Sequence, residues 1–98
     1  MKKLKESSSS LLNKPGHQTI AAVSWNIEIE YVSDSDFELT ISDCRNVVNL
    51  FFNVDTDENF DNAMFKVDTL TKQIREFKAA LKKAKRIYNI NQKGKNAS

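Results

Sequence analysis

Apolar and polar residues alternate in three successive runs in the middle of the chain. The runs AVSWNIEIEYV (22–32), FELTIS (37–42) and VVNLFFNV (47–54) place apolar side chains at every second position. A period of two is typical of a β-strand with one buried face. The polar stretches SDSD (33–36) and DCRN (43–46) separate the runs and predict turns. The pattern therefore predicts a three-stranded antiparallel meander.

The alternation assigns the strand residues to two faces of this sheet. The inner face is expected to be apolar and to hold Val23, Trp25, Ile27, Ile29, Tyr31, Phe37, Leu39, Ile41, Val48, Leu50, Phe52 and Val54. The outer face is expected to be polar and acidic, but Val47 and Phe51 fall on it as well. An apolar pair inside an acidic rim is typical of a protein-binding patch. The candidate contact residues on this face are Glu28, Glu30, Glu38, Val47 and Phe51.

The period changes after the third run. Apolar residues recur at alternating spacings of three and four, at Phe60, Ala63, Val67, Leu70, Ile74, Phe77, Leu81, Ala84 and Tyr88. Such a heptad seam is typical of an α-helix with one apolar stripe. Because residues 57–93 contain neither proline nor glycine, we expect one helix from about Glu58 to about Asn89.

A competing interpretation concerns residues 62–67. Ala63, Phe65 and Val67 also alternate, as a fourth strand would. The heptad seam accounts for more positions, so the sequence favours the helix. In a helix Phe65 lies opposite the seam and is exposed, which makes it a sixth candidate contact residue. In a strand Phe65 would be buried.

These elements predict an α+β fold, a three-stranded antiparallel meander with the long C-terminal helix packed on its apolar face. A helix of roughly 30 residues is about 45 Å long, whereas a strand of about 8 residues spans about 27 Å. The sheet therefore cannot cover the whole seam. The excess can overhang, kink back, or pack against a partner or a second copy of the chain in a homodimer.

The ends of the chain differ in composition from the middle. Residues 1–18 are rich in lysine and serine and predict a disordered basic tail, and residues 91–98 predict a disordered C-terminal tail. Residues 19–90 are then a single α+β domain. No run of apolar residues is long enough for a signal peptide or a membrane span, so we expect no membrane contact. A single cysteine, Cys44, suits a reducing compartment, and we expect a cytoplasmic protein.

Charge is distributed unevenly around a net charge of +2. Residues 17–67 hold ten acidic against two basic residues, and residues 68–98 hold nine basic against two acidic. A basic helix end can contact the phosphates of a nucleic acid, and it is also common in soluble helices. The residues that a nucleic acid would contact are Lys78, Lys82, Lys83, Lys85 and Arg86.

The stretch VDTDENFDNAM, residues 54–64, is the only motif that suggests a metal. Counted from Asp55 as a calcium-binding loop, the required glycine at position 6 is Phe60 and the required glutamate at position 12 is Lys66. We therefore expect a helix start with Thr56 or Asp57 as N-cap, and no metal. The only histidine, His17, lies in the predicted tail, and no set of residues activates Cys44 as a nucleophile.

These observations favour a small non-enzymatic protein without a cofactor. We expect a protein-binding module, such as an inhibitor, an immunity-type protein or an adaptor, that occupies a surface on a larger partner. The alternative is a nucleic-acid-binding accessory protein that uses its basic helix. The first hypothesis depends on the outer face of the sheet, and the second depends on residues 72–95.

Overall fold

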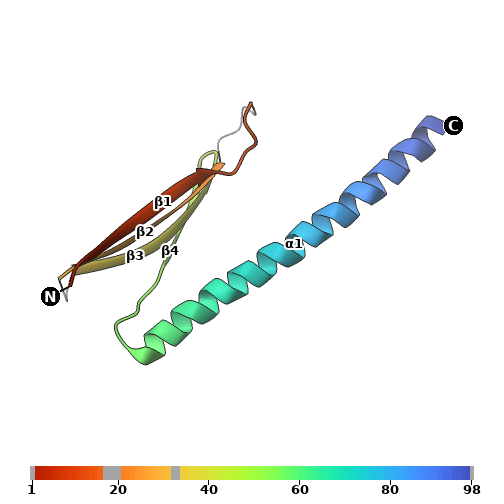
Figure 1. The fold of residues 1–98 in the computed structure, drawn as a ribbon. Coiled ribbons are helices and arrows are strands. Elements are labelled where there is room, and N and C mark those ends of the chain that lie inside the picture. Colours follow the sequence, from red (N-terminus) through yellow and green to blue (C-terminus); the bar gives the residue numbers. More distant parts are fainter. Residues whose placement is uncertain (1, 17–20, 32–33, 98) are drawn as a thin grey trace. The chain divides into compact units, whose positions relative to one another are not determined.

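The structure is a computed structural model that describes residues 2–16, 21–31 and 34–97. It contains four β-strands followed by one α-helix (Figure 1). The elements are β1 (Leu4–Leu11), β2 (Ala21–Tyr31), β3 (Asp34–Asp43), β4 (Asn46–Phe51) and α1 (Asp57–Ala97). The chain divides into two compact units, Met1–Thr56 and Asp57–Ser98. The α+β class is confirmed.

The first unit is a single antiparallel sheet with the strand order β1-β2-β3-β4. Its register brings the apolar positions of the three predicted strands together. Trp25 of β2 lies opposite Leu39 of β3, which lies opposite Leu50 of β4. A parallel row joins Val23, Ile41 and Val48 in the same way. The predicted alternation of faces is confirmed across these strands, because a slip of one residue would have reversed them.

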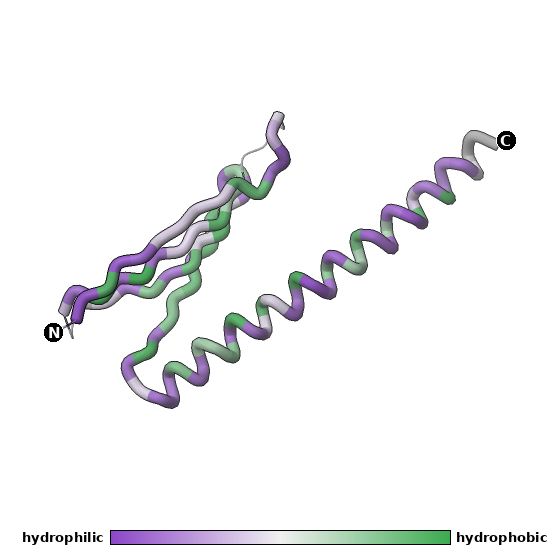
Figure 2. Tube along the Cα trace, viewed as in Figure 1, coloured by the Kyte–Doolittle hydropathy of each residue, from purple (hydrophilic) through white to green (hydrophobic). Residues whose placement is uncertain are grey.

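The sheet has four strands, so the expected number of three was wrong. The additional strand, β1, pairs with β2 from Leu4 opposite Ile29 to Leu11 opposite Ala22. The sequence predicts a disordered tail for these residues, because four consecutive serines and several lysines show no apolar alternation. Figure 2 shows β1 as mostly hydrophilic, in contrast with its neighbours. Backbone hydrogen bonds to β2 hold this polar strand in the sheet, since every strand residue carries a donor and an acceptor.

The connections between strands also differ in part from those predicted. β3 begins at Asp34, within the stretch predicted as a turn, whereas Ser33 lies outside the described residues. Cys44 and Arg45 form a two-residue hairpin turn between Asp43 and Asn46, as predicted. Cys44 has a φ of 54°, in the left-handed region where glycine is favoured. Pro15 and Gly16 form a turn after β1, and Gly16 has a φ of 94°, which glycine adopts without a steric cost.

The second unit is the single helix α1, 41 residues long. The heptad interpretation is confirmed, and residues 62–67 are helical rather than a strand. The helix starts directly after Thr56, and Asp57 and Glu58 in its first turn suit the positive end of its dipole. It ends at Ala97 rather than near Asn89, so the segment expected to be a C-terminal tail is largely helical. The packing of α1 on the sheet stays a prediction.

Little of the described chain is deeply buried. Only Ala21 and Ala63 are less than one-tenth exposed, at 7% each, and no large side chain among the described residues is fully buried. The inward residues of β2 and β3 are mostly half-buried, whereas Val48 on the edge strand β4 is 54% exposed. Apolar side chains of both units are therefore available to a further surface.

Candidate protein-binding surface

The outer face of the sheet brings together four of the six predicted contact residues. Glu38 of β3 lies opposite Phe51 of β4, and four residues further along β3 Ser42 lies opposite Val47. Asn26 of β2 lies opposite Glu38 and therefore shares its face of the sheet. Glu28 is two residues further along β2, so it lies on this face as well. Phe51 is 60% exposed and Val47 is 59% exposed. We call this group, Glu28, Glu38, Val47 and Phe51, the outer patch.

Polar side chains tie the strands together within this face. The amide Nδ2 of Asn26 donates a hydrogen bond to Oδ2 of Asp36, at 3.0 Å. The hydroxyl oxygen of Thr40 lies 3.2 Å from Oε1 of Glu38 and 3.0 Å from Oδ1 of Asn49. A hydroxyl has one hydrogen to donate, so it serves one of these two acceptors at a time. These bonds orient neutral side chains between the carboxylates.

The acidic character of the face has a source that the sequence reasoning missed. Asp36 of β3 lies directly opposite Glu28 of β2, which places two carboxylates on neighbouring strands. Like charges in this arrangement repel each other. On the other side of β2, Lys5 of β1 lies opposite Glu28. β1, which the sequence predicts as part of a tail, thus supplies the compensating positive charge of Lys5. Had Asp36 been assigned to a strand rather than a turn, its alternation with Glu38 would have identified it.

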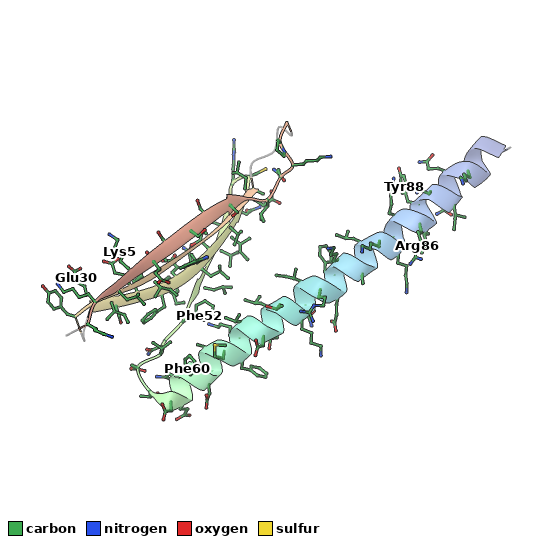
Figure 3. All side chains as sticks on the ribbon, viewed as in Figure 1. Lys5, Glu30, Phe52, Phe60, Arg86 and Tyr88 are labelled. Atoms are coloured by element: carbon green, nitrogen blue, oxygen red, sulfur yellow. The ribbon has the colours of Figure 1, made fainter. Side chains whose placement is uncertain are left out.

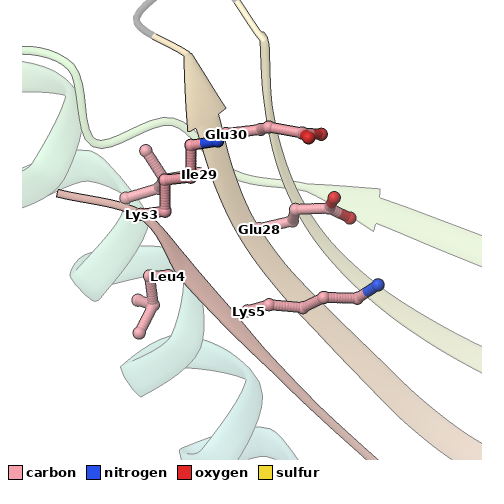
Figure 4. A pocket seen from close by; sticks show the side chains of 6 residues that line it. All are labelled: Lys3, Leu4, Lys5, Glu28, Ile29 and Glu30. Carbon is pink, nitrogen blue, oxygen red and sulfur yellow. The ribbon is translucent and has the colours of Figure 1, made fainter. Parts of the chain in front are cut away.

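Figure 4 shows the end of the sheet where this compensation occurs. A surface pocket there is lined by Lys3, Leu4, Lys5, Glu28, Ile29 and Glu30. Lys5, Glu28 and Glu30 extend to the same side, so one ammonium group and two carboxylates gather beside the pocket (Figure 4). The ammonium nitrogen of Lys3 lies 5.1 Å from the centre of the Tyr31 ring, within range of a cation–π interaction. The outer face is therefore acidic in its centre and basic at the start of β1, where Lys5 lies.

The two remaining predicted residues, Glu30 and Phe65, are not members of the outer patch. Glu30 is at an irregularity in the β2–β3 pairing, between Ile29 and Tyr31, and lies at the rim of the pocket. Phe65 belongs to α1, in the other unit, and is 71% exposed. The structure therefore supports Phe65 as an exposed aromatic residue and does not group it with the sheet residues.

The basic residues of the alternative hypothesis all lie on α1 and are all exposed. At 100° per residue, the five side chains of Lys78, Lys82, Lys83, Lys85 and Arg86 fall within an arc of about 160° that leaves the seam uncovered. The ammonium nitrogen of Lys85 lies 5.8 Å from the centre of the Tyr88 ring. Figure 3 labels Arg86 and Tyr88 in the C-terminal part of the helix.

Catalytic or metal-binding chemistry finds little support in the described residues. Within residues 2–16, 21–31 and 34–97, no three histidine, cysteine, aspartate or glutamate side chains are grouped so as to hold a metal ion. Cys44 is exposed at the tip of the β3–β4 turn, and His17 lies outside the described residues. The acidic stretch after β4 forms the approach to α1, where Oδ1 of Asn53 accepts a hydrogen bond of 3.1 Å from the backbone N–H of Asp55.

Two further observations bear on the class of protein. Within the described residues, α1 contains no stretch that is both long and apolar enough to cross a lipid bilayer. No protein-family model, curated protein or solved structure matches the chain. The function must therefore be argued from the surfaces themselves.

Proposed function

We propose that this chain is a small non-enzymatic protein-binding module that occupies a surface on a larger partner protein through the outer patch. The observation that carries this proposal is the position of Phe51. Its ring is 60% exposed on an edge strand and lies directly opposite Glu38, with Val47 further along the same strand. Large aromatic side chains surrounded by polar groups are the residues that most often dominate binding energy at protein interfaces.

The chemistry of the patch indicates the kind of partner. Phe51 and Val47 supply apolar contact area, and Glu28, Asp36 and Glu38 supply negative charge on the same face. A complementary surface has an apolar recess with lysine or arginine residues around it. The charges mainly set the association rate and the choice of partner, whereas burial of Phe51 sets the dissociation rate. The action is that of an inhibitor, an immunity-type protein or an adaptor, and we assign it to the cytoplasm because the single cysteine suits a reducing compartment.

The experiment is an affinity capture from source-cell lysate with matched variants of the full chain. Phe51→Ala removes the aromatic ring and Glu28→Lys reverses one charge of the patch. The control, Ile90→Ala, removes an apolar side chain that is 66% exposed on α1 and does not belong to the sheet. We expect a stoichiometric protein that resists nuclease, is retained by the control and is lost with Phe51→Ala.

Affinity measurements with that protein then give the size of the effect. Truncation of a dominant interface aromatic costs 2 kcal/mol or more, so we expect Phe51→Ala to raise the Kd by roughly thirtyfold or more. Glu28→Lys should act mainly by slowing association at low salt. A captured protein that binds both variants as tightly as the unmodified chain would show that the outer patch is not the binding surface.

A second function is favoured by one observation on α1. Because the helix continues to Ala97, its basic residues form one long exposed side of a regular rod, as contacts along a phosphate backbone require. In this case Lys82→Glu and Arg86→Glu weaken binding of a fluorescent oligonucleotide, and the affinity falls steeply with salt. Lys3→Glu, on the sheet, is the matched control. Oligonucleotide binding that is indifferent to both helix substitutions would exclude this use of α1.

A further inference from the structure

The apolar seam of α1 is exposed along most of its length. The exposed fractions are 48% for Phe60, 41% for Val67, 61% for Ile74, 64% for Phe77, 53% for Leu81 and 59% for Tyr88. In heptad terms these residues, with Ala63, Leu70 and Ala84, occupy alternating a and d positions over four heptads. A stripe of this regularity is typical of a helix that packs against another helix.

The length of the seam limits what can cover it. From Phe60 to Tyr88 the helix rises about 42 Å at 1.5 Å per residue. The strands of the sheet have 6 to 11 residues, which corresponds to about 20–36 Å. A second, antiparallel copy of α1 matches the seam from Phe60 to Ala84, because it carries the same heptad repeat.

The distribution of charge along α1 decides the direction of such a pair. Residues 57–68 hold four acidic and one basic residue, and residues 72–86 hold seven basic and one acidic residue. Two parallel copies would bring the two basic segments side by side. Two antiparallel copies bring the acidic segment of each helix beside the basic segment of the other, and their helix dipoles also oppose each other favourably.

The sizes of the seam residues fit an antiparallel register. When Phe60 faces Ala84 of the second copy, Ala63 faces Leu81, Val67 faces Phe77, and Leu70 faces Ile74. In the three outermost of these layers a large side chain meets a small or medium one, as close packing requires. A parallel pair would instead stack alanine on alanine at two layers and phenylalanine on phenylalanine at two others, which leaves voids beside overfilled layers.

We propose that two copies of this chain form a homodimer through an antiparallel α1 pair in which Phe60 of one copy faces Ala84 of the other. The same register brings Asp57 beside Lys85 of the second copy, which gives two symmetric ion pairs. Thr71 lies beside Thr71 of the second copy near the two-fold axis. Its hydroxyl already donates to the carbonyl of Val67 in its own helix, at 2.9 Å, so it brings no unsatisfied donor to the interface.

The first test measures the mass of the full chain in solution by light scattering over a range of concentrations. We expect twice the chain mass of 11.2 kDa. Asp57→Lys and Lys85→Asp each place like charges together and are expected to raise the dimer Kd by about three- to tenfold. The double variant restores opposite charges, so its Kd should return toward that of the unmodified chain. These positions are exposed on the helix surface, and the comparison therefore does not depend on a variant that fails to fold.

The second test distinguishes the direction of the helices by disulfide trapping, in a Cys44→Ser background that removes the only native thiol. In the proposed register the cysteine of Thr71→Cys forms a disulfide with the same cysteine of the second copy, across the two-fold axis. Lys78→Cys forms no such disulfide, because residue 78 faces Met64 of the second copy. In a parallel pair each seam residue faces the same residue of the second copy, so the cysteines of two Ala63→Cys copies would form a disulfide with each other. We expect efficient dimer trapping with Thr71→Cys alone.

Three outcomes would overturn the proposal. A chain that is monomeric at every accessible concentration would show that something else covers the seam, such as the apolar face of its own sheet. Self-trapping of Ala63→Cys without trapping of Thr71→Cys would show a parallel pair. A dimer whose Kd is unchanged by the charge variants, and in which neither cysteine variant forms a disulfide, would place the interface outside α1. Because these experiments use the chain alone, they succeed or fail independently of the outer patch and its partner.

Discussion

The sheet and the helix are both built on regular backbone hydrogen bonds, yet they treat their apolar side chains differently. In the sheet, apolar residues of three strands line up in rows, such as Trp25, Leu39 and Leu50, and shield one another across the strands. In α1 the apolar residues are stacked along one stripe of a single helix, and Ile74 and Phe77 are more than 60% exposed. The pairing of strands creates side-chain contacts, whereas the coiling of a helix creates a surface that needs a second surface.

This difference has an energetic consequence. Burial of apolar area contributes roughly 25 cal/mol per Å², and most of the stability of protein helices comes from packing of their apolar face rather than from intrinsic propensity. The sheet obtains part of that contribution within the chain. The helix obtains this contribution only when another surface packs against its seam. Its stability should therefore depend on protein concentration under conditions that leave the sheet unchanged.

The largest effect is expected from a charge placed in the apolar row of the sheet. Leu39 is half-buried between Trp25 and Leu50, so Leu39→Asp should lower the free energy of unfolding of the sheet by about 2–4 kcal/mol. The fluorescence of Trp25, the only tryptophan, reports the change during urea unfolding. The control, Asn49→Asp, adds the same charge on the outer face and should cost less than about 1 kcal/mol. Equal effects of the two substitutions would mean that the faces are wrongly assigned.

A change of protein concentration should separate the two units. If α1 is held in a dimer, tenfold dilution lowers its apparent stability by about 1.4 kcal/mol, which corresponds to a fall of several degrees in Tm. We expect this shift in the helical circular dichroism signal at 222 nm and not in the fluorescence of Trp25. A melting temperature that is the same at all concentrations for both signals would contradict the comparison.

A smaller effect tests the strand that the sequence concealed. Lys5→Glu places a third carboxylate in line with Glu28 and Asp36, and we expect a loss of about 0.5–1 kcal/mol in the stability of the sheet. The double variant Lys5→Glu with Glu28→Lys should recover most of this loss, measured by urea unfolding. Lys2→Glu, outside the strand, is the control. The absence of any recovery in the double variant would argue against the β1–β2 register.

The smallest effect is expected at the tip of the β3–β4 hairpin. Cys44 holds a φ of 54°, which strains a residue with a side chain and suits glycine. We expect Cys44→Gly to stabilise the sheet by about 0.5 kcal/mol, because relief of strain exceeds the entropy that glycine adds to the unfolded chain. Arg45→Gly, next to it, should be neutral or destabilising. Thermal unfolding of the two variants in parallel checks the sign.

The sequence predicts the elements in which apolar residues recur with a regular period, such as β2 and α1. It does not predict β1, in which apolar residues have no regular period. Alternation over 22–32 and the heptads after Phe60 have a direct physical cause, since one face of each element is apolar, and both predictions are confirmed in kind. β1 has no such face, and its strand state depends on hydrogen bonds to β2 that no local pattern records. Two signals were available in hindsight. The pair Pro15–Gly16 marks a reversal of the chain, and Lys5 complements the charge of Glu28.

The candidate site was predicted in the same uneven way. Side chains along a strand point alternately to the two faces of the sheet, and this alternation was enough to place Glu38, Val47 and Phe51 on one face. The alternation could not reveal Lys5, because its strand was not recognised, nor Asp36, which was assigned to a turn. Residues from different units, such as Phe65 and Phe51, cannot be grouped by local periodicity at all.

The strictly sequential order of the strands bears on how the chain reaches its native state. Every strand pairs only with its neighbours in sequence, so the sheet can close hairpin by hairpin and needs no long-range search. Folds dominated by such local pairings fold faster than those that join distant segments. On a ribosome that adds about 5–20 residues per second, the 41 residues of α1 follow the sheet by about 2–8 s. The sheet therefore has time to form before its own helix is complete.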